Sequence, residues 1–365
     1  MAEYEYEYDI QRQSRFNAIE AVEISEECLY LEMERHPGKM KQHPFTIWTN
    51  AELSIEATDR LNSAVSPHRL LYSANMSSLN LDLGQPDLQL AEADIAFGQP
   101  DPEQIIRSPK LRWIHLTTAG YTPYDRSDLR SELRTRDASM TSSSGVYDEP
   151  CAQHVLAMMM AFARQLPDSH TAQATDRSWP DAERRRTSFL MNGQTAIIFG
   201  FGEIAIRLCE LLAPFRMNLI GVRRRARGNE SIQIIDESQI DDYLPIADHV
   251  ISVLPANTTT VGYFDSHKFQ SMKRGAFFYN IGRGATVDQV ALEKALRSGQ
   301  LASAYLDVMT PEPLPPDHAL WDTPNCLITP HSAGGYGGEM MGLVDHFLEN
   351  LHRFSTGAQL LNRII

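Results

Sequence analysis

The sequence lacks the features of a disulfide-rich, zinc-binding or membrane protein. It has only four cysteines, Cys28, Cys151, Cys209 and Cys326, with no C-x-x-C pair and no short Cys/His cluster. We therefore expect free thiols, no metal site and a reducing compartment. No apolar run approaches the ~18 uninterrupted residues of a membrane span. The acidic N-terminus, MAEYEYEYD, shows no secretory signal, which favours the cytoplasm.

Positive charge is also scarce. The chain has 33 Lys and Arg residues against 47 Asp and Glu residues, a formal net charge of -14. This balance argues against a nucleic-acid partner, which needs clustered cations, and against binding to an anionic membrane. One basic run, Arg223-Arg224-Arg225-Ala226-Arg227, breaks the trend. With 365 residues, 42% of them hydrophobic, the chain can bury two cores.

The first part of the chain divides near Phe45. Residues 1–43 begin with an alternating Glu/Tyr run, which indicates either an arm laid on a partner subunit or a frayed terminus. Strands then alternate with helices, a pattern typical of a parallel sheet. A buried helix is predicted from Glu149 to about Leu166, with Pro150 near its start. The predicted strands cover 45–48, 68–72, 94–98 and 111–116.

A second alternating series runs from residue 194 to residue 330. Its six predicted strands cover 194–200, 218–222, 249–254, 277–281, 303–308 and 326–329. This rhythm predicts an α/β fold with a doubly wound parallel sheet of the dinucleotide-binding type. One more amphipathic helix is predicted from Glu339 to Phe354.

A glycine-rich turn follows the first strand of the second series. Gly200-Phe201-Gly202-Glu203-Ile204-Ala205 reads G-x-G-x-x-A between a predicted strand and a predicted helix. Gly200 allows the tight turn, and Gly202 lets the backbone approach a pyrophosphate at the helix N-terminus. We therefore predict a dinucleotide site that includes Gly200, Phe201, Gly202, Glu203 and Ile204.

The residues after the second strand indicate which dinucleotide binds. An NAD site usually has Asp or Glu there for the ribose 2′-hydroxyl. Here Gly221-Val222 is followed by Arg223, Arg224 and Arg225, whose guanidinium groups suit a 2′-phosphate. The sequence therefore predicts NADP as cofactor, with NAD possible if these arginines form only a solvated turn.

Three later turns carry the candidate catalytic residues. They are N-I-G-R-G (280–284), D-V-M-T-P-E-P (307–313) and T-P-H (329–331), each at the C-terminal end of a predicted strand. Arg283 can hold a substrate carboxylate and carbonyl, and His331 can be the acid/base. Glu312 can orient the imidazole and favour its protonated form. Together they suit the reduction of a 2-oxo acid.

With the glycine loop, these ordered motifs resemble the D-isomer-specific 2-hydroxyacid dehydrogenase family from about Phe45 onward. The resemblance implies a second, flavodoxin-like doubly wound domain, a cleft between the two domains, and a homodimer. It predicts an extension (1–43), a substrate domain (44–148 and 332–365) and a dinucleotide-binding Rossmann domain (149–331). Arg223 departs from the family's usual acidic residue, and Glu312 speaks against the formate dehydrogenase branch.

The resemblance also assigns further site residues. It places Thr118, Ala119 and Gly120 on the substrate carboxylate, with Gly98, Gln99 and Arg283 beside them. Asp307 is expected to contact the nicotinamide. The remaining residues expected beside the cofactor are Leu254, Pro255, Thr260, Ile281, Gly282, His331, Ala333 and Gly334.

The activity implied is the interconversion of a small 2-oxo acid and a D-2-hydroxy acid by hydride transfer, with glyoxylate and hydroxypyruvate as first candidates. Two alternatives stay open at this stage. One is a nucleotide-sensing regulatory protein of the same fold, similar to a corepressor, which docks through its acidic N-terminal segment. The other is an enzyme of this family that acts on a different small anion.

Overall fold

The computed structural model describes residues 44–77, 84–226, 228 and 230–365, so residues 1–43 and both readings of them lie outside the described chain. The first sheet has five parallel strands in the order β2-β1-β3-β4-β5. This is the flavodoxin-like order for a doubly wound sheet. The strands are β1 (Thr46–Ala51), β2 (Arg69–Ser77), β3 (Ile95–Gly98), β4 (Trp113–Leu116) and β5 (Ser139–Thr141).

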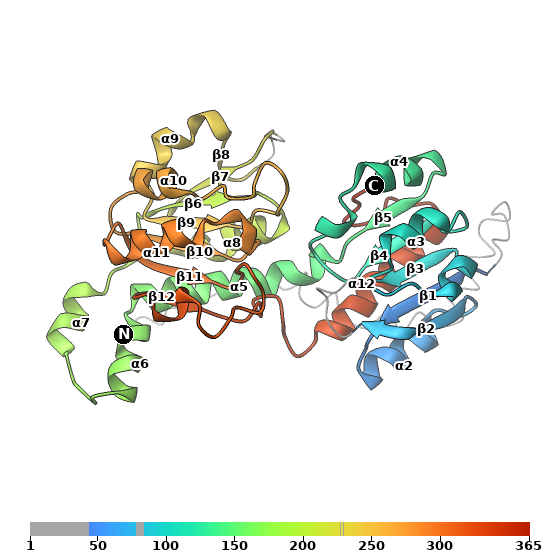
Figure 1. Ribbon diagram of the computed structural model, residues 1–365, viewed down its shortest axis with the longest axis horizontal. Helices are drawn as coiled ribbons and strands as arrows, with labels where there is room; N and C mark the ends of the chain where they lie inside the picture. The colour runs from blue at the N-terminus through green and yellow to red at the C-terminus, as the bar shows by residue number, and fades with distance from the viewer. Residues whose placement is uncertain (1–43, 78–83, 227, 229) are drawn as a thin grey trace, which may run out of the picture. The chain divides into compact units, whose positions relative to one another are not determined.

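Helices cover this sheet, including one from the far end of the chain. Ile47 and Trp48 are neighbours on β1 and both are buried, as expected for a parallel strand covered on both faces. The last helix lies beside the strands of this sheet (Figure 1). Its Phe347 ring stacks on Phe97 of β3, with centroids 4.4 Å apart, and on Trp113 of β4, at 5.3 Å. The helices of this region are α2 (Ile55–Ala64), α3 (Pro102–Arg107), α4 (Ser127–Thr135) and α12 (Glu339–Thr356).

The second sheet has seven parallel strands in the order β12-β11-β10-β9-β6-β7-β8. The chain reverses direction across the sheet between β6 and β9, which creates the switch point where dinucleotides bind in such folds. The strands are β6 (Thr195–Phe199), β7 (Asn218–Val222), β8 (Gln233–Ile235), β9 (His249–Ser252), β10 (Ala276–Asn280), β11 (Leu301–Leu306) and β12 (Cys326–Ile328). The main helices are α8 (Glu203–Leu212), α9 (Ile240–Tyr243), α10 (Ser266–Ser271) and α11 (Gln289–Arg297).

The predicted start of the long helix, Glu149, is wrong. It is α5 (Ser144–Ala163), so it begins before Glu149 and contains Pro150 in its interior. Val146 and Tyr147, upstream of the proline, are both buried in the core, and their burial offsets the backbone hydrogen bond that a proline lacks. After α5 the chain forms two further helices, α6 (Leu166–Ala174) and α7 (Asp181–Thr187), neither of which buries a side chain.

The predicted α/β class and both parallel sheets are confirmed, whereas the limits of the two domains stay a prediction. Residues 44–365 form one compact unit. Within the described residues, Cys151, Cys209 and Cys326 are free thiols, and no helix is long and apolar enough to span a membrane. Those residues also contain no group of three acidic, His or Cys side chains placed to hold a metal ion.

Candidate active site

The glycine-rich turn lies at the switch point, between β6 and α8. Gly200 has a φ of +91°, and a Cβ there would lie 2.7 Å from the carbonyl oxygen of Val253, so a side chain would be strained. Gly202 is the N-cap of α8, and a Cβ on it would meet no atom within 4 Å. The backbone at the positive end of the helix is therefore accessible to an anion.

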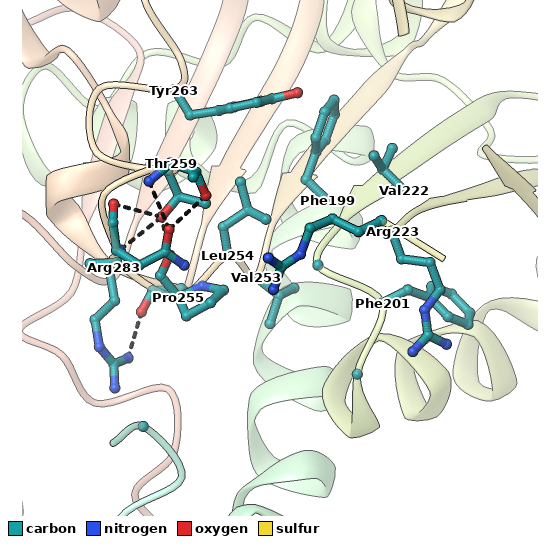
Figure 2. Close-up of a pocket in the computed structure, with 18 of the residues that line it drawn as sticks. Phe199, Phe201, Val222, Arg223, Val253, Leu254, Pro255, Thr259, Tyr263 and Arg283 are labelled. Atoms are coloured by element: carbon teal, nitrogen blue, oxygen red, sulfur yellow. Dashed lines mark hydrogen bonds between the residues drawn. The ribbon is translucent and has the colours of Figure 1, made fainter. Parts of the chain in front are cut away.

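A cavity of about 1310 Å³ runs over this turn and is shown in Figure 2. Its size and its position at a helix N-terminus fit a dinucleotide. Most of the residues predicted beside the cofactor line it, namely Gly200, Phe201, Gly202, Glu203, Ile204, Arg223, Arg224, Arg225, Leu254, Pro255, Thr260, Ile281 and Gly282. Four predicted residues do not line it, namely Asp307, His331, Ala333 and Gly334.

The arginines after β7 have an acidic neighbour that the sequence reasoning missed. Arg223 Nη1 lies 3.1 Å from Oε1 of Glu230. Arg224 and Arg225 line the cavity and are exposed. Glu230 escaped notice because it follows Arg223 by seven positions and no short motif links the two.

Arg283 lies just beyond the C-terminal end of β10 and lines the same cavity. Its Nη1 donates to the carbonyl of Gly282 at 2.6 Å. Its guanidinium also lies against Gly120, where a Cβ would come within 1.7 Å of Nη2. Burial lowers the pKa of Arg283, and the charge of Glu312 acts in the opposite direction. The side chain stays cationic at neutral pH because an arginine starts from so high a value.

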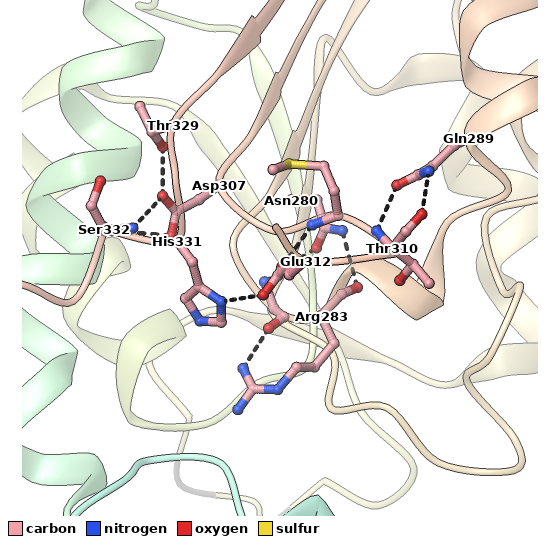
Figure 3. A network of polar contacts seen from close by, with 12 residues as sticks. Asn280, Arg283, Gln289, Asp307, Thr310, Glu312, Thr329, His331 and Ser332 are labelled. Carbon is pink, nitrogen blue, oxygen red and sulfur yellow. Dashed lines mark hydrogen bonds and ion pairs between the residues drawn. The ribbon is translucent and has the colours of Figure 1, made fainter. Parts of the chain in front are cut away.

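Glu312 follows β11 and His331 follows β12, the next strand in the sheet. Figure 3 shows both side chains beside Arg283. His331 Nδ1 lies 2.7 Å from Glu312 Oε2, while Glu312 Oε1 accepts from the backbone N–H of Met309 at 2.8 Å. Burial raises the pKa of Glu312. The hydrogen bonds from His331 and Met309, with the charges of His331 and Arg283, outweigh it and lower the pKa overall. The carboxylate is therefore ionised beside the imidazole at neutral pH.

Asp307 organises the turn that carries His331. Its buried carboxylate accepts from Thr329 Oγ1 at 2.5 Å, from Ser332 N at 2.9 Å and from Ala333 N at 3.0 Å. These bonds bracket His331, whose φ of +51° is unusual for a residue other than glycine. The carboxylate thus has a structural task beside the nicotinamide contact predicted for it, which stays a prediction.

The predicted substrate loop, residues 117–120, is fixed by hydrogen bonds from the buried side chain of Gln99. Gln99 is buried, and its Nε2 donates to Thr117 Oγ1 at 3.0 Å and to Thr118 Oγ1 at 3.2 Å. Ala119 and Gly120 line the cavity, whereas Gly98, Gln99 and Thr118 do not. Sequence reasoning missed Tyr147, whose hydroxyl lies 3.0 Å from the carbonyl oxygen of Thr117. Nothing in the sequence around Tyr147 links it to this loop.

The family model for the NAD binding domain of D-isomer specific 2-hydroxyacid dehydrogenases matches residues 156–333. The glyoxylate reductase of Aeropyrum pernix is 30% identical over 276 residues, which are 72% of this chain and 80% of that protein. The mouse glyoxylate reductase/hydroxypyruvate reductase is 31% identical over 208 residues, 55% of this chain and 62% of that protein.

A solved structure agrees over a longer stretch. It is a D-isomer specific 2-hydroxyacid dehydrogenase family protein from Aeromonas salmonicida, with a TM-score of 0.70 and 28% identity. The match covers 88% of this chain and 99% of that one. It therefore includes both sheets, not the nucleotide-binding sheet alone.

Proposed function

Because the chain belongs to the D-isomer-specific 2-hydroxyacid dehydrogenase family, we propose that it is an NADPH-preferring reductase of a small 2-oxo acid, with His331 as the acid/base. The observation that carries this proposal is the contact of 2.7 Å between His331 and Glu312, with Arg283 on the neighbouring strand end. These groups match the proton donor, its orienting carboxylate and the substrate cation that the reaction needs. Binding of NAD(P) follows from the family itself.

The proposed chemistry divides the work between cofactor and chain. The bound cofactor supplies the hydride that reaches C2 of the 2-oxo acid. Arg283 and the backbone around Ala119 and Gly120 hold the substrate carboxylate and polarise the carbonyl. His331 keeps Nδ1 on Glu312, so Nε2 is the ring nitrogen that delivers a proton to the carbonyl oxygen. The product is the D-2-hydroxy acid, and in the reverse direction the neutral Nε2 accepts the proton.

The proposed preference for NADPH rests on charge. Arg224 and Arg225 are exposed in the cavity just after β7, where the ribose 2′-substituent of a dinucleotide lies in such folds. A 2′-phosphate gains charge-assisted hydrogen bonds there that a hydroxyl cannot match. Michaelis constants for NADPH and NADH, measured on the same substrate, test this point. A lower constant for NADH would contradict it.

The substrate is best sought among the smallest 2-oxo acids, because the relatives named above reduce glyoxylate or hydroxypyruvate. NADPH oxidation is followed with glyoxylate, hydroxypyruvate, pyruvate and phenylpyruvate. Oxidation with glyoxylate or hydroxypyruvate supports the proposal, and rapid turnover only with phenylpyruvate would point to a larger pocket. If none of the four acids supports NADPH oxidation although NADPH binds measurably, the proposed activity is overturned and a regulatory role is favoured.

We also expect a homodimer that works in the cytoplasm. The solvent exposure of α6 and α7, with the 90% exposure of Trp179 between them, supports the dimer. The free thiols of the described cysteines support the cytoplasm. Light scattering of the purified chain tests the dimer, and a monomeric mass would contradict it.

A further inference from the structure

Glu230 is tied to the arginine at the start of the basic run. Its Oε1 lies 3.1 Å from Arg223 Nη1, and its Oε2 accepts from the backbone N–H of Gly228 at 2.8 Å. The side chains of Arg223 and Glu230 are only 18% and 8% exposed. The contact with the backbone N–H of Gly228 fixes the carboxylate in place, so Glu230 is held against Arg223 from two sides.

The two partners differ in their access to the cavity. Arg223 lines it, whereas Glu230 is not among its lining residues. Glu230 therefore contacts the guanidinium without occupying the space where a ligand would lie. An anion that enters the cavity and binds Arg223 meets a guanidinium whose charge Glu230 already partly neutralises. The anion is also repelled by the negative charge of the Glu230 carboxylate.

We propose that Glu230 is a specificity-determining residue that limits the preference for NADPH over NADH by competing with the 2′-phosphate for Arg223. The proposal deepens the function given above and rests on its placement of the 2′-phosphate just after β7, where Arg223 lines the cavity beside Arg224 and Arg225. NADH has a hydroxyl at this position and leaves the Arg223–Glu230 pair intact. Glu230 therefore affects the two cofactors unequally, whereas an ion pair that only stabilises the turn would affect both alike.

The decisive variant is Glu230→Gln, which keeps the shape and one acceptor oxygen of the side chain but removes its charge. Dissociation constants for NADPH and NADH are measured by fluorescence titration in the absence of substrate, so no turnover is needed. We expect NADPH to bind about 3- to 10-fold more tightly to the variant and NADH to change by less than about twofold. Unchanged or weaker NADPH binding would overturn the proposal.

Two further variants secure the interpretation. In an Arg223→Gln background, Glu230→Gln should gain less than about twofold for NADPH, because the guanidinium of Arg223, for which Glu230 is proposed to compete, is gone. An equal gain in both backgrounds would show that Glu230 does not act through Arg223. Glu293→Gln is the matched control, because Glu293 forms a similar pair with Arg297 on α11, away from the cavity. It should leave both dissociation constants unchanged.

If Glu230→Gln does not fold, Glu230→Asp shortens the side chain and weakens the contact, and a gain of about twofold for NADPH is expected. No gain in either variant contradicts the proposal. The outcome is separable from that of the proposed cofactor preference. If the wild-type chain binds both cofactors equally and Glu230→Gln still tightens NADPH alone, the preference fails and the inference stands. If the wild type prefers NADPH and Glu230→Gln changes nothing, the reverse holds.

Discussion

The Nδ1 atom of His331 lies 2.7 Å from Oε2 of Glu312, and the two residues follow adjacent strands, β12 and β11, of one sheet. The other oxygen of Glu312 is fixed by the N–H of Met309 at 2.8 Å. The imidazole is thus oriented by a carboxylate that is itself anchored to the backbone. This arrangement determines the tautomer of the ring and its direction.

Replacing Glu312 by Gln tests that arrangement. The amide still fills the space but no longer supports a positive imidazolium, so we expect kcat for reduction to fall by about 10- to 100-fold. NADPH affinity should stay within about twofold of the wild type, because Glu312 does not line the cavity that would hold the cofactor. Steady-state kinetics measures kcat, and NADPH titration measures the affinity. An equal loss of NADPH affinity would show that Glu312 is structural.

Gly120→Ala tests the contact between the substrate loop and Arg283. A Cβ at this position would come within 1.7 Å of Arg283 Nη2, so the guanidinium must move. We expect kcat/KM for the 2-oxo acid to fall at least about tenfold, since misplacement of a binding group weakens transition-state stabilisation. Gly337→Ala, where an added Cβ meets no atom within 4 Å, is the control. Equal activity in both variants would show that Gly120 is not needed to position Arg283.

Asp307→Asn tests the turn that carries His331. One carboxylate oxygen becomes an NH₂ group that faces either the hydroxyl of Thr329 and the N–H of Ser332, or the N–H of Ala333. We expect kcat to fall by about 10- to 100-fold and the free energy of unfolding to fall by about 1–3 kcal/mol. Chemical denaturation and steady-state kinetics measure the two quantities. Asp322→Asn, at an exposed aspartate, is the control, and a fully active, fully stable Asp307→Asn would contradict the assignment.

The buried histidines predict how stability depends on pH. Burial lowers the pKa of His249 from 6.5 to about 4, with the charge of Asp248 acting in the opposite direction. Burial also lowers the pKa of His115 well below its usual value. As the pH falls below 6.5, the unfolded chain binds protons that the folded chain does not, so stability is lost progressively down to about pH 4.

His249 alone accounts for up to about 3 kcal/mol of that loss. Urea unfolding at a series of pH values measures it. In His249→Gln the decline should be shallower, whereas replacement of the exposed His267 by Gln should leave it unchanged. A wild-type free energy that stays constant from about pH 7 to about pH 5 would contradict this prediction.

The parts of the fold that could be predicted are those with long apolar patterns in the sequence. Every predicted strand of the second series corresponds to an observed one, because buried parallel strands are continuous apolar runs. Strands β5 and β8 were missed, and each spans only three residues, too few to show a period. The equally short β12 was predicted from its apolar residues Cys326, Leu327 and Ile328. Tertiary packing determines the edge strands β5 and β8. The start of α5 was missed for the same reason, since burial of Val146 and Tyr147 outweighs the proline signal.

The residues of the candidate site that could be predicted are those that directly follow the C-terminal end of a strand. Arg283, Glu312 and His331 were identified because each follows a strand whose C-terminal end meets the others at one sheet edge. The supporting contacts were not predictable. The pairing of Glu230 with Arg223, and the bonds of Asp307 to the turn around His331, depend on how loops fold back in space. No residue pattern encodes those distances.

The most direct test of the account compares the wild-type chain with His331→Gln. The rate of NADPH oxidation with glyoxylate or hydroxypyruvate is measured at saturating concentrations, and NADPH affinity is measured separately by titration. We expect turnover by the wild type and a kcat lower by about 100- to 10,000-fold in the variant, with NADPH still bound. Equal turnover by both proteins, or none by the wild type with either acid, would contradict it.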